Sequence, residues 1–207
     1  MSANKRSIWF HLFDVFLNIV IILAIVGIIR TFLVSPFQVE GNSMLDTLSH
    51  KEYIIINKLT YYIGDPMRGD TVVFRPPTDH KKHYVKRVIG EPGDTVSIRG
   101  GNVYVKKPGR EFVKLEEPYL NERNQGSTFK HPPSSGNTGE VEYEVPEGHY
   151  FLLGDNRQGS LDSRSFAANS NNKASSFVPK KDIKGRVWFV ALPITKIHAL
   201  EPPVYGF

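Results

Sequence analysis

One candidate nucleophile is a serine that follows closely on a long apolar run. Ser43 lies in the stretch Gly41–Leu45, a few residues after that run ends near Val34. Glycine and asparagine accept unusual backbone angles, so the stretch predicts a turn between an extended segment and the next element. Taken alone, such a serine is an ordinary turn residue. Its place just beyond an apolar span also makes its hydroxyl a candidate for chemistry at a membrane surface.

A candidate base lies in the stretch Lys82–Asp94. Residues Tyr84–Ile89 predict a strand, in which Lys86 and Arg87 point to opposite faces because side chains alternate. If either face belongs to a core, one of these two cations is withdrawn from water. A lysine in that position can lose its proton, because desolvation disfavours the charged ammonium. The alternative interpretation is an edge strand whose two cations reach into solvent.

A third stretch, Leu153–Arg164, is dense in Asp, Asn, Ser and Arg side chains. Asp155 could form a two-point ion pair with Arg157 or Arg164. Asp162 could pair with Arg164 in the same way, and either pair would stiffen a loop. The spacing lacks the acidic ligands and the final glutamate of a calcium loop. We therefore expect structural ion pairs around a site rather than a metal centre.

The elements that must position these groups begin with an apolar run over Leu12–Val34. A helix of roughly 20 residues crosses a bilayer, so the run predicts a single transmembrane anchor after a short segment, residues 1–11. A cleaved secretory signal is the alternative, but the run is long and no small-x-small cleavage site follows it. Lys5 and Arg6 before the run predict a cytoplasmic N-terminus in the cell membrane and an extracytoplasmic domain over residues 35–207.

After the anchor, short β-branched or aromatic runs alternate with turn signals, which predicts a mostly β, antiparallel domain. The predicted strands are Phe37–Glu40, Tyr53–Lys58, Thr71–Phe74, Tyr84–Ile89, Thr95–Ile98, Asn102–Val105, Glu140–Val145, His149–Leu153 and Arg186–Ala191. Two polar segments interrupt them: an insertion over Lys106–Gly139, loop-like or a small subdomain, and a loop over Ala167–Ser176. We expect neither to contribute to the core. Leu200–Pro203 predicts an extended tail.

The composition limits the classes of function. With 207 residues, 40% hydrophobic and 23% charged, the chain can form one anchor and one domain with a core. The net charge of +5 is spread over scattered basic residues, so we expect no nucleic-acid partner. Zero cysteines exclude disulfides and cysteine nucleophiles. No G-x-S-x-G elbow or H-E-x-x-H motif is present to favour a Ser-His-Asp triad or a zinc site.

Together and in this order, the three stretches resemble the type I signal peptidases, which are membrane-anchored serine proteases that remove signal peptides from exported proteins. After the anchor, the resemblance is carried by Gly41–Met44 with Thr47 and Leu48, by Gly69–Phe74, by Tyr84–Gly90, and by Gly154–Arg157 with Ser160, Asp162, Ser163 and Arg164. It extends to about Pro193. Each motif alone is weak, whereas their order and spacing are highly specific.

The resemblance implies a Ser/Lys dyad with Ser43 as nucleophile and Lys86 as general base, and no cofactor. A neutral lysine can take the proton of a serine hydroxyl that is otherwise a poor nucleophile. By the same match, Ser160 would hydrogen-bond and orient the Lys86 amine, and the Ser43 backbone N–H would be an oxyanion donor. The supporting shell around them would consist of Asp155, Arg157, Asp162 and Arg164.

The implied partners are the lipid bilayer and exported preproteins with signal peptides. A substrate lying extended between the segment Gln38–Gly41 and the strand Lys82–Val85 would form backbone hydrogen bonds with both. Its alternate side chains would then enter shallow pockets. We expect these pockets to accept only small groups at the first and third positions before the cut. The apolar residues expected to line them are Val39, Tyr84 and Val85.

The chain departs from the family pattern at three positions. Asp46 occupies a place where proline is usual, Ala167 one where glycine is common, and Gly41 one where some members have a hydroxyl that helps the oxyanion. Asp46 either accepts a backbone N–H in the turn or raises the Lys86 pKa by its charge. It is also the motivation for one alternative, a tethered β domain that binds exported peptides without cleaving them. A self-cleaving soluble repressor is disfavoured because no DNA-binding helical unit precedes the serine.

Overall fold

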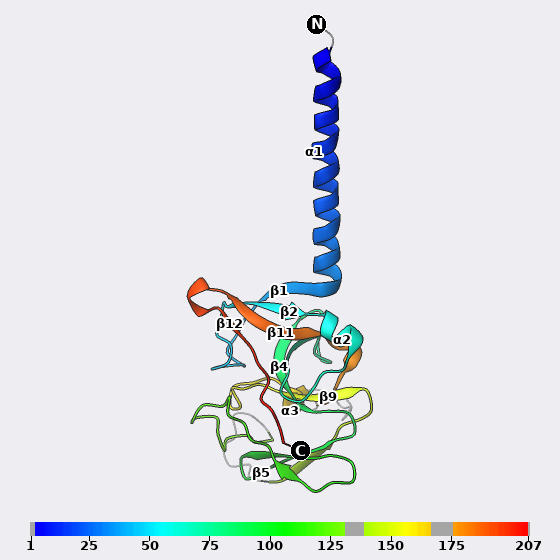
Figure 1. Ribbon diagram of the computed structural model, residues 1–207. Coiled ribbons are helices and arrows are strands. Elements are labelled where there is room, and N and C mark those ends of the chain that lie inside the picture. The colour runs from blue at the N-terminus through cyan, green and yellow to red at the C-terminus, as the bar shows by residue number, and fades with distance from the viewer. Residues whose placement is uncertain (1–2, 131–138, 167–175, 207) are drawn as a thin grey trace.

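The computed structural model describes residues 3–130, 139–166 and 176–206. The chain starts with the helix α1 (Ala3–Ile28), which continues as a π-helical turn, η1 (Ile29–Leu33). This helix stands away from the β strands in Figure 1. Its stretch Ile8–Leu33 is long and apolar enough, by length and composition, to cross a membrane. The helix begins earlier than the predicted anchor over 12–34 and ends one residue before it.

The larger sheet follows directly on the helix. Its strands are β1 (Val34–Gln38), β2 (Tyr53–Asn57), β3 (Thr71–Phe74), β4 (Tyr84–Gly90), β9 (His149–Leu153), β10 (Val178–Pro179), β11 (Ile183–Leu192) and β12 (His198–Ala199). Their order is β1-β2-β11-β3-β4-β9-β10, with β12 paired to β11, and all these pairs are antiparallel. Because β1 starts at Val34, the apolar helix leads straight into the edge of this sheet. The strand expected over Phe37–Glu40 therefore lies nearer the helix than predicted.

A second, four-stranded antiparallel sheet lies at the end of the domain away from the helix (Figure 1). Its strands are β5 (Thr95–Arg99), β6 (Asn102–Lys106), β7 (Val113–Lys114) and β8 (Val141–Glu144), in the order β7-β6-β5-β8. Short helical segments complete the described part of the chain: α2 (Leu59–Ile63), α3 (Ser163–Phe166), η3 (Lys180–Asp182) and η4 (Ile194–Lys196). The predicted fold class, a mostly β antiparallel domain behind one apolar helix, is confirmed.

The insertion over 106–139 contributes to the core, and the expectation that it would not was wrong. Leu115, in this insertion, is 2% exposed and packs in the apolar cluster between the second sheet and β9. Leu120 is buried as well. Apolar side chains in an otherwise polar segment can enter a core when neighbouring strands leave space. The mostly polar composition of the whole segment hides these few side chains. The loop predicted over 167–176 lies, apart from Ser176, outside the described residues.

The C-terminal segment is extended, as predicted for Leu200–Pro203. In Figure 1 it runs from β12 along the domain towards the second sheet. Leu200 packs against the cluster under β2 and β11, and Tyr205 packs against the cluster of the second sheet. The tail therefore spans both halves of the β domain.

Candidate active site

Ser43 lies in the turn that joins β1 to β2. Gly41 has a φ of +92°, a conformation that favours glycine, and the Leu48 N–H donates to the Met44 carbonyl at 2.8 Å. Met44 and Leu48 are buried in the apolar cluster below the turn, so the turn is held from beneath. From the side, the Asn156 N–H donates to the Ser43 carbonyl at 3.0 Å. These contacts hold the half-buried Ser43 at the surface of the domain.

Lys86 reaches Ser43 from the middle of the sheet. Its strand, β4, pairs with β3 on one side and β9 on the other, so the edge-strand interpretation is wrong. Lys86 is 3% exposed, and its Nζ lies 2.6 Å from Ser43 Oγ and 2.8 Å from the Val85 carbonyl oxygen. When Lys86 is neutral, the Ser43 hydroxyl can donate to Nζ across this distance.

Burial lowers the pKa of Lys86 to about 8 from its ordinary value of 10.5. The carboxylates of Asp162 and Asp155 oppose this shift, and the positive charge of Arg164 adds to it. Desolvation dominates because an ammonium removed from water loses its solvation. A lysine in this environment is neutral in a substantial fraction of molecules at mildly alkaline pH, the form that can accept a proton.

Ser160 is close to the dyad without forming the expected hydrogen bond to Lys86. Its hydroxyl is buried and has no hydrogen-bond partner among the described residues. It nevertheless contributes to lowering the Asp162 pKa, so the two side chains are near neighbours. A Cβ on Gly154 would collide with Ser160 Oγ and with the Ser43 carbonyl oxygen. Glycine at this position therefore allows the loop after β9 to pack directly against the Ser43 turn.

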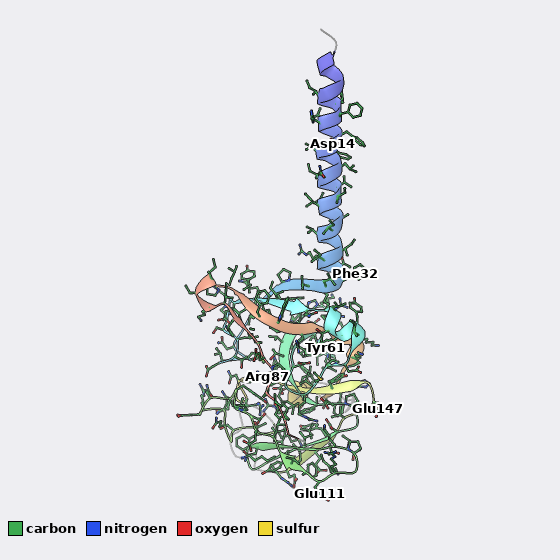
Figure 2. All side chains as sticks on the ribbon, viewed as in Figure 1. Asp14, Phe32, Tyr61, Arg87, Glu111 and Glu147 are labelled. Carbon is green, nitrogen blue, oxygen red and sulfur yellow. The ribbon has the colours of Figure 1, made fainter. Side chains whose placement is uncertain are left out.

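Arg87 points to the opposite face of β4 from Lys86 and is equally buried. Its guanidinium donates to Asp155 at 2.9 and 2.7 Å and to the Gly69 carbonyl at 2.8 Å (Figure 2 labels Arg87 inside the domain). Asp155 also accepts from the Thr47 hydroxyl at 2.5 Å. The predicted pairing of Asp155 with Arg157 or Arg164 was wrong, because the partner comes from β4, 68 residues earlier. Asp155 thus connects the Ser43 turn, β4 and the loop after β9.

The other predicted ion pair, between Asp162 and Arg164, is present. Arg164 donates to both Asp162 oxygens at 2.8 and 2.7 Å, and the Gly154 N–H donates to the same carboxylate at 3.1 Å. Burial by itself would raise the Asp162 pKa, but the charge and hydrogen bonds of Arg164 outweigh it and hold this pKa below its ordinary value. Asp162 is therefore ionised. Its bonds to Gly154 and Arg164 hold together the start and the end of the loop after β9.

Arg157 is fully buried and pairs with a residue of the insertion. It donates to Glu117 Oε2 at 2.9 Å, to a second Glu117 oxygen, and to the Thr128 hydroxyl at 2.6 Å. The ring of Tyr119, from the same segment, lies 3.8 Å from the Arg87 guanidinium carbon. Residues 117–128 therefore form the outer support of the loop after β9.

A cleft with a volume of about 350 Å³ runs past the Ser43 and Lys86 side chains. Every predicted substrate-contacting residue lines it: Gln38, Val39, Gly41, Tyr84 and Val85. His83, from the predicted segment Lys82–Val85, lines it as well, and Phe37, Ile54, Val73 and Leu161 line it without having been predicted. Among the described residues, no group of three or more His, Cys, Asp or Glu side chains is placed to hold a metal ion.

The sequence of this chain matches the family model described as "Signal peptidase, peptidase S26" over residues 12–192. The chain belongs to the signal peptidase family. Signal peptidase I of Bacillus licheniformis is 38% identical over 201 residues, which is 97% of each chain. Signal peptidase I T of Bacillus subtilis (strain 168) is 42% identical over 147 residues, 71% of this chain and 72% of that protein. A crystal structure of a signal peptidase I from Enterococcus faecalis V583 aligns with a TM-score of 0.44 and 29% identity, covering 60% of this chain and 97% of that one.

Membership of the signal peptidase family makes this chain a serine endopeptidase.

Its departure from the usual family sequence at Asp46 has a structural counterpart in the insertion. Asp46 is exposed, and its Oδ2 accepts a hydrogen bond from the Asn121 side chain at 2.5 Å. Neither alternative considered from the sequence, a cap on a backbone N–H or a charge that raises the Lys86 pKa, corresponds to this contact. Asp46 joins the Ser43 turn to residues 117–128.

The signal peptidase motifs did not point to Glu117, Tyr119 or Asn121. All three lie in a segment that looked like a polar insertion, 32 to 75 residues from Arg157, Arg87 and Asp46, the groups that they contact around the site. The Glu-Glu-Pro-Tyr run between Leu115 and Leu120 carries no periodic pattern, so no local signal marks these side chains. The available hint was Arg157, because a buried arginine needs a carboxylate partner and Asp155 was open to other cations.

Proposed function

We propose that this signal peptidase cleaves signal peptides from exported preproteins, with Ser43 as nucleophile and Lys86 as general base. The observation that carries this proposal is the 2.6 Å separation of Lys86 Nζ and Ser43 Oγ at the wall of an open cleft. The separation is short enough for direct proton transfer from hydroxyl to amine. The lowered Lys86 pKa supplies the neutral amine that this transfer requires.

The proposed reaction begins when the neutral Lys86 amine takes the proton of the Ser43 hydroxyl as Oγ attacks the scissile carbonyl carbon. The carbonyl oxygen becomes an oxyanion, and the Ser43 backbone N–H is the donor that we propose for it. Lys86 then gives its proton to the departing amine, which leaves an acyl group on Ser43. A water molecule, deprotonated by Lys86, then attacks this ester, releases the signal peptide with a free carboxyl group and restores the Ser43 hydroxyl.

The amine that leaves in the first step is the new N-terminus of the exported protein, and the acyl group hydrolysed in the second step is the signal peptide. Gly41 has no side chain that could add a second donor, so the oxyanion would depend on backbone groups and water. The remaining buried ion pairs, Arg87 with Asp155 and Asp162 with Arg164, would hold the geometry without exchanging protons.

The substrate is proposed to lie extended along the cleft between β1 and β4. Gln38 is at the end of β1, and Tyr84 and Val85 begin β4, so peptide groups on both sides can pair with an added strand. Apolar side chains at the cleft, among them Val39 and Val73, leave shallow space for small groups. This arrangement supports the choice of exported preproteins, whose cleavage sites we expect to carry small residues.

The proposed topology places residues 1–11 in the cytoplasm and the β domain, residues 35–207, outside the cell membrane. Its support is the pair Lys5 and Arg6 before the apolar helix. Protease added to intact spheroplasts should cut at the exposed Arg110–Glu111 region and leave the segment before Phe10 intact. Cleavage of that segment with protection of Arg110 would show the opposite orientation.

Cleavage of a labelled peptide in detergent tests the function. The wild-type chain should cut a signal peptide carrying alanine at the first and third positions before the cut, and Lys86→Ala should not. Full activity of Lys86→Ala would reject the proposed base. Binding of the peptide by the wild type without any cleavage would instead favour the alternative of a tethered peptide-binding domain.

A further inference from the structure

A second cleft, with a volume of about 580 Å³, lies beside the foot of the membrane helix. It shares no lining residue with the cleft at Ser43. Figure 2 labels Phe32 at the lower end of the helix and Tyr61 just below it. The residues that line this second cleft are Thr31, Lys58, Tyr61, Tyr62, Lys180, Lys181, Ile183 and Lys184. It therefore combines the last turn of the helix with α2 and the segment around η3.

The charge of this cleft is strongly positive. Two carboxylates lie near its four lysines: Asp65 pairs with Lys180 at 2.5 Å, and Asp182 lies close to Lys184. Neither Lys181 nor Lys184 forms a salt bridge within the described part of the chain. Burial lowers the pKa of Lys184, and the nearby positive charge of Arg75 lowers it further. Cations outnumber carboxylates here, so the cleft is suited to an anion.

Lys58 joins the cleft to the last turn of the membrane helix, and Lys180 joins it to the end of α2. The Lys58 ammonium donates to the carbonyl oxygens of Arg30 and Thr31 at 3.0 and 3.1 Å, and the Lys180 ammonium donates to the Gly64 carbonyl at 3.0 Å. Tyr62 is 67% exposed at the rim. Tyrosine is favoured where hydrocarbon meets water, because its ring is apolar and its hydroxyl is polar. The apolar stretch of the helix ends at Leu33, so a bilayer crossed by this helix would have its headgroups at the level of the cleft.

We propose that this cleft binds the phosphate headgroup of an anionic phospholipid from the bilayer that the helix crosses. The phosphodiester oxygens would accept hydrogen bonds from Lys181 and Lys184, which are not committed to a carboxylate. The acyl chains would lie along the exposed side chains of Ile29 and Phe32. A lipid held in this way would tether the β domain to the membrane surface at a second point, beside the covalent link through β1.

The test uses the full-length chain in dodecyl maltoside and measures its melting temperature with short-chain lipids. Dioctanoyl phosphatidylglycerol at saturating concentration should raise Tm by about 5 °C, because a ligand that binds only the folded state stabilises it. Dioctanoyl phosphatidylcholine and inorganic phosphate should leave Tm unchanged. Lys181→Gln/Lys184→Gln should lose most of the rise given by phosphatidylglycerol.

The matched control is Arg110→Gln/Lys114→Gln, which removes the same charge at the far end of the domain, where Figure 2 labels Glu111. This variant should keep the full rise in Tm. Lys181→Gln alone changes an exposed side chain and tests the proposal even if the double variant misfolds. It should lose part of the rise in Tm. An equal rise with phosphatidylcholine, an equal rise with inorganic phosphate, or a full rise in Lys181→Gln/Lys184→Gln would each overturn the proposal. None of these measurements depends on peptidase activity.

Discussion

The guanidinium of Arg157, in the loop after β9, is paired with the carboxylate of Glu117, 40 residues earlier in the insertion. Arg157 is completely buried and Glu117 nearly so. A buried cation of this kind depends on its partner, because water cannot reach it. The insertion is therefore part of the support of the active site as well as part of the core.

Replacement of Glu117 should destabilise the fold. Glu117→Ala leaves a buried guanidinium without its carboxylate, which we expect to lower the free energy of unfolding by about 3 kcal/mol. Glu116→Ala, at the exposed neighbouring position, should change it by less than about 0.5 kcal/mol. Urea denaturation of the three chains measures both effects. Equal stabilities for the two variants would show that the pair contributes nothing.

The proposed dyad predicts non-additive losses of activity. Ser43→Ala and Lys86→Ala should each lower kcat/KM by at least about 10³-fold, because each removes one half of a single proton-transfer unit. The double variant should be hardly less active than either single variant. Steady-state cleavage of a labelled peptide provides the measurement. Multiplicative losses in the double variant would mean that the two residues act independently.

The activity should depend on pH through Lys86. Lys86 must be neutral to accept a proton, and a lysine is neutral above its pKa, so kcat/KM should rise with pH through about 8 and then level off. Asp46→Asn should leave this limb unmoved, since Asp46 is exposed and bonded to Asn121. Profiles of kcat/KM against pH for the wild type and Asp46→Asn measure the position of this limb. An acid shift of the limb in Asp46→Asn would show that this carboxylate does raise the Lys86 pKa.

The same lysine should reduce the stability of the fold at neutral pH. Its pKa is about 8 in the folded chain and ordinarily 10.5. Between pH 8 and pH 10.5 the unfolded chain binds more protons than the folded chain, so the free energy of unfolding rises with pH. Below about pH 8 the folded chain bears the full cost of the buried ammonium, about 3 kcal/mol. Lys86→Met should therefore raise the free energy of unfolding at pH 7, and the gain should shrink as the pH approaches 10.5. Urea denaturation at pH 7 and pH 10 measures it; an identical gain at both values would contradict the lowered pKa.

Substrate selection should follow the small size of the cleft at Ser43. A bulky residue in place of alanine at the first or third position before the cut should strongly suppress cleavage, because alternate side chains of an extended peptide point into the cleft wall. The second position should tolerate the same change, since its side chain points away. Cleavage rates of three matched peptides test this expectation, and equal rates for all three would refute the extended arrangement.

The local pattern of the sequence indicated most of the longer strands and the groups that could react, but not the two-residue strands β7, β10 and β12. Alternation and turn residues predicted Thr71–Phe74 and His149–Leu153 with the bounds that β3 and β9 have. The apolar run predicted the helix, and the order of the motifs predicted the family. These features depend on neighbours a few residues apart, which a sequence displays directly.

The tertiary structure decided which side chains meet. Asp155 pairs with Arg87 rather than with the arginines beside it, and Arg157 pairs with Glu117. Both outcomes depend on β4 lying next to β9 and on the insertion packing against the following loop, which no periodic pattern encodes. Burial then makes the choice of partner decisive, because a cation without water must have a carboxylate within hydrogen-bonding distance. For the same reason, the lowered pKa of Lys86 follows from its position inside the sheet and not from its neighbours in the chain.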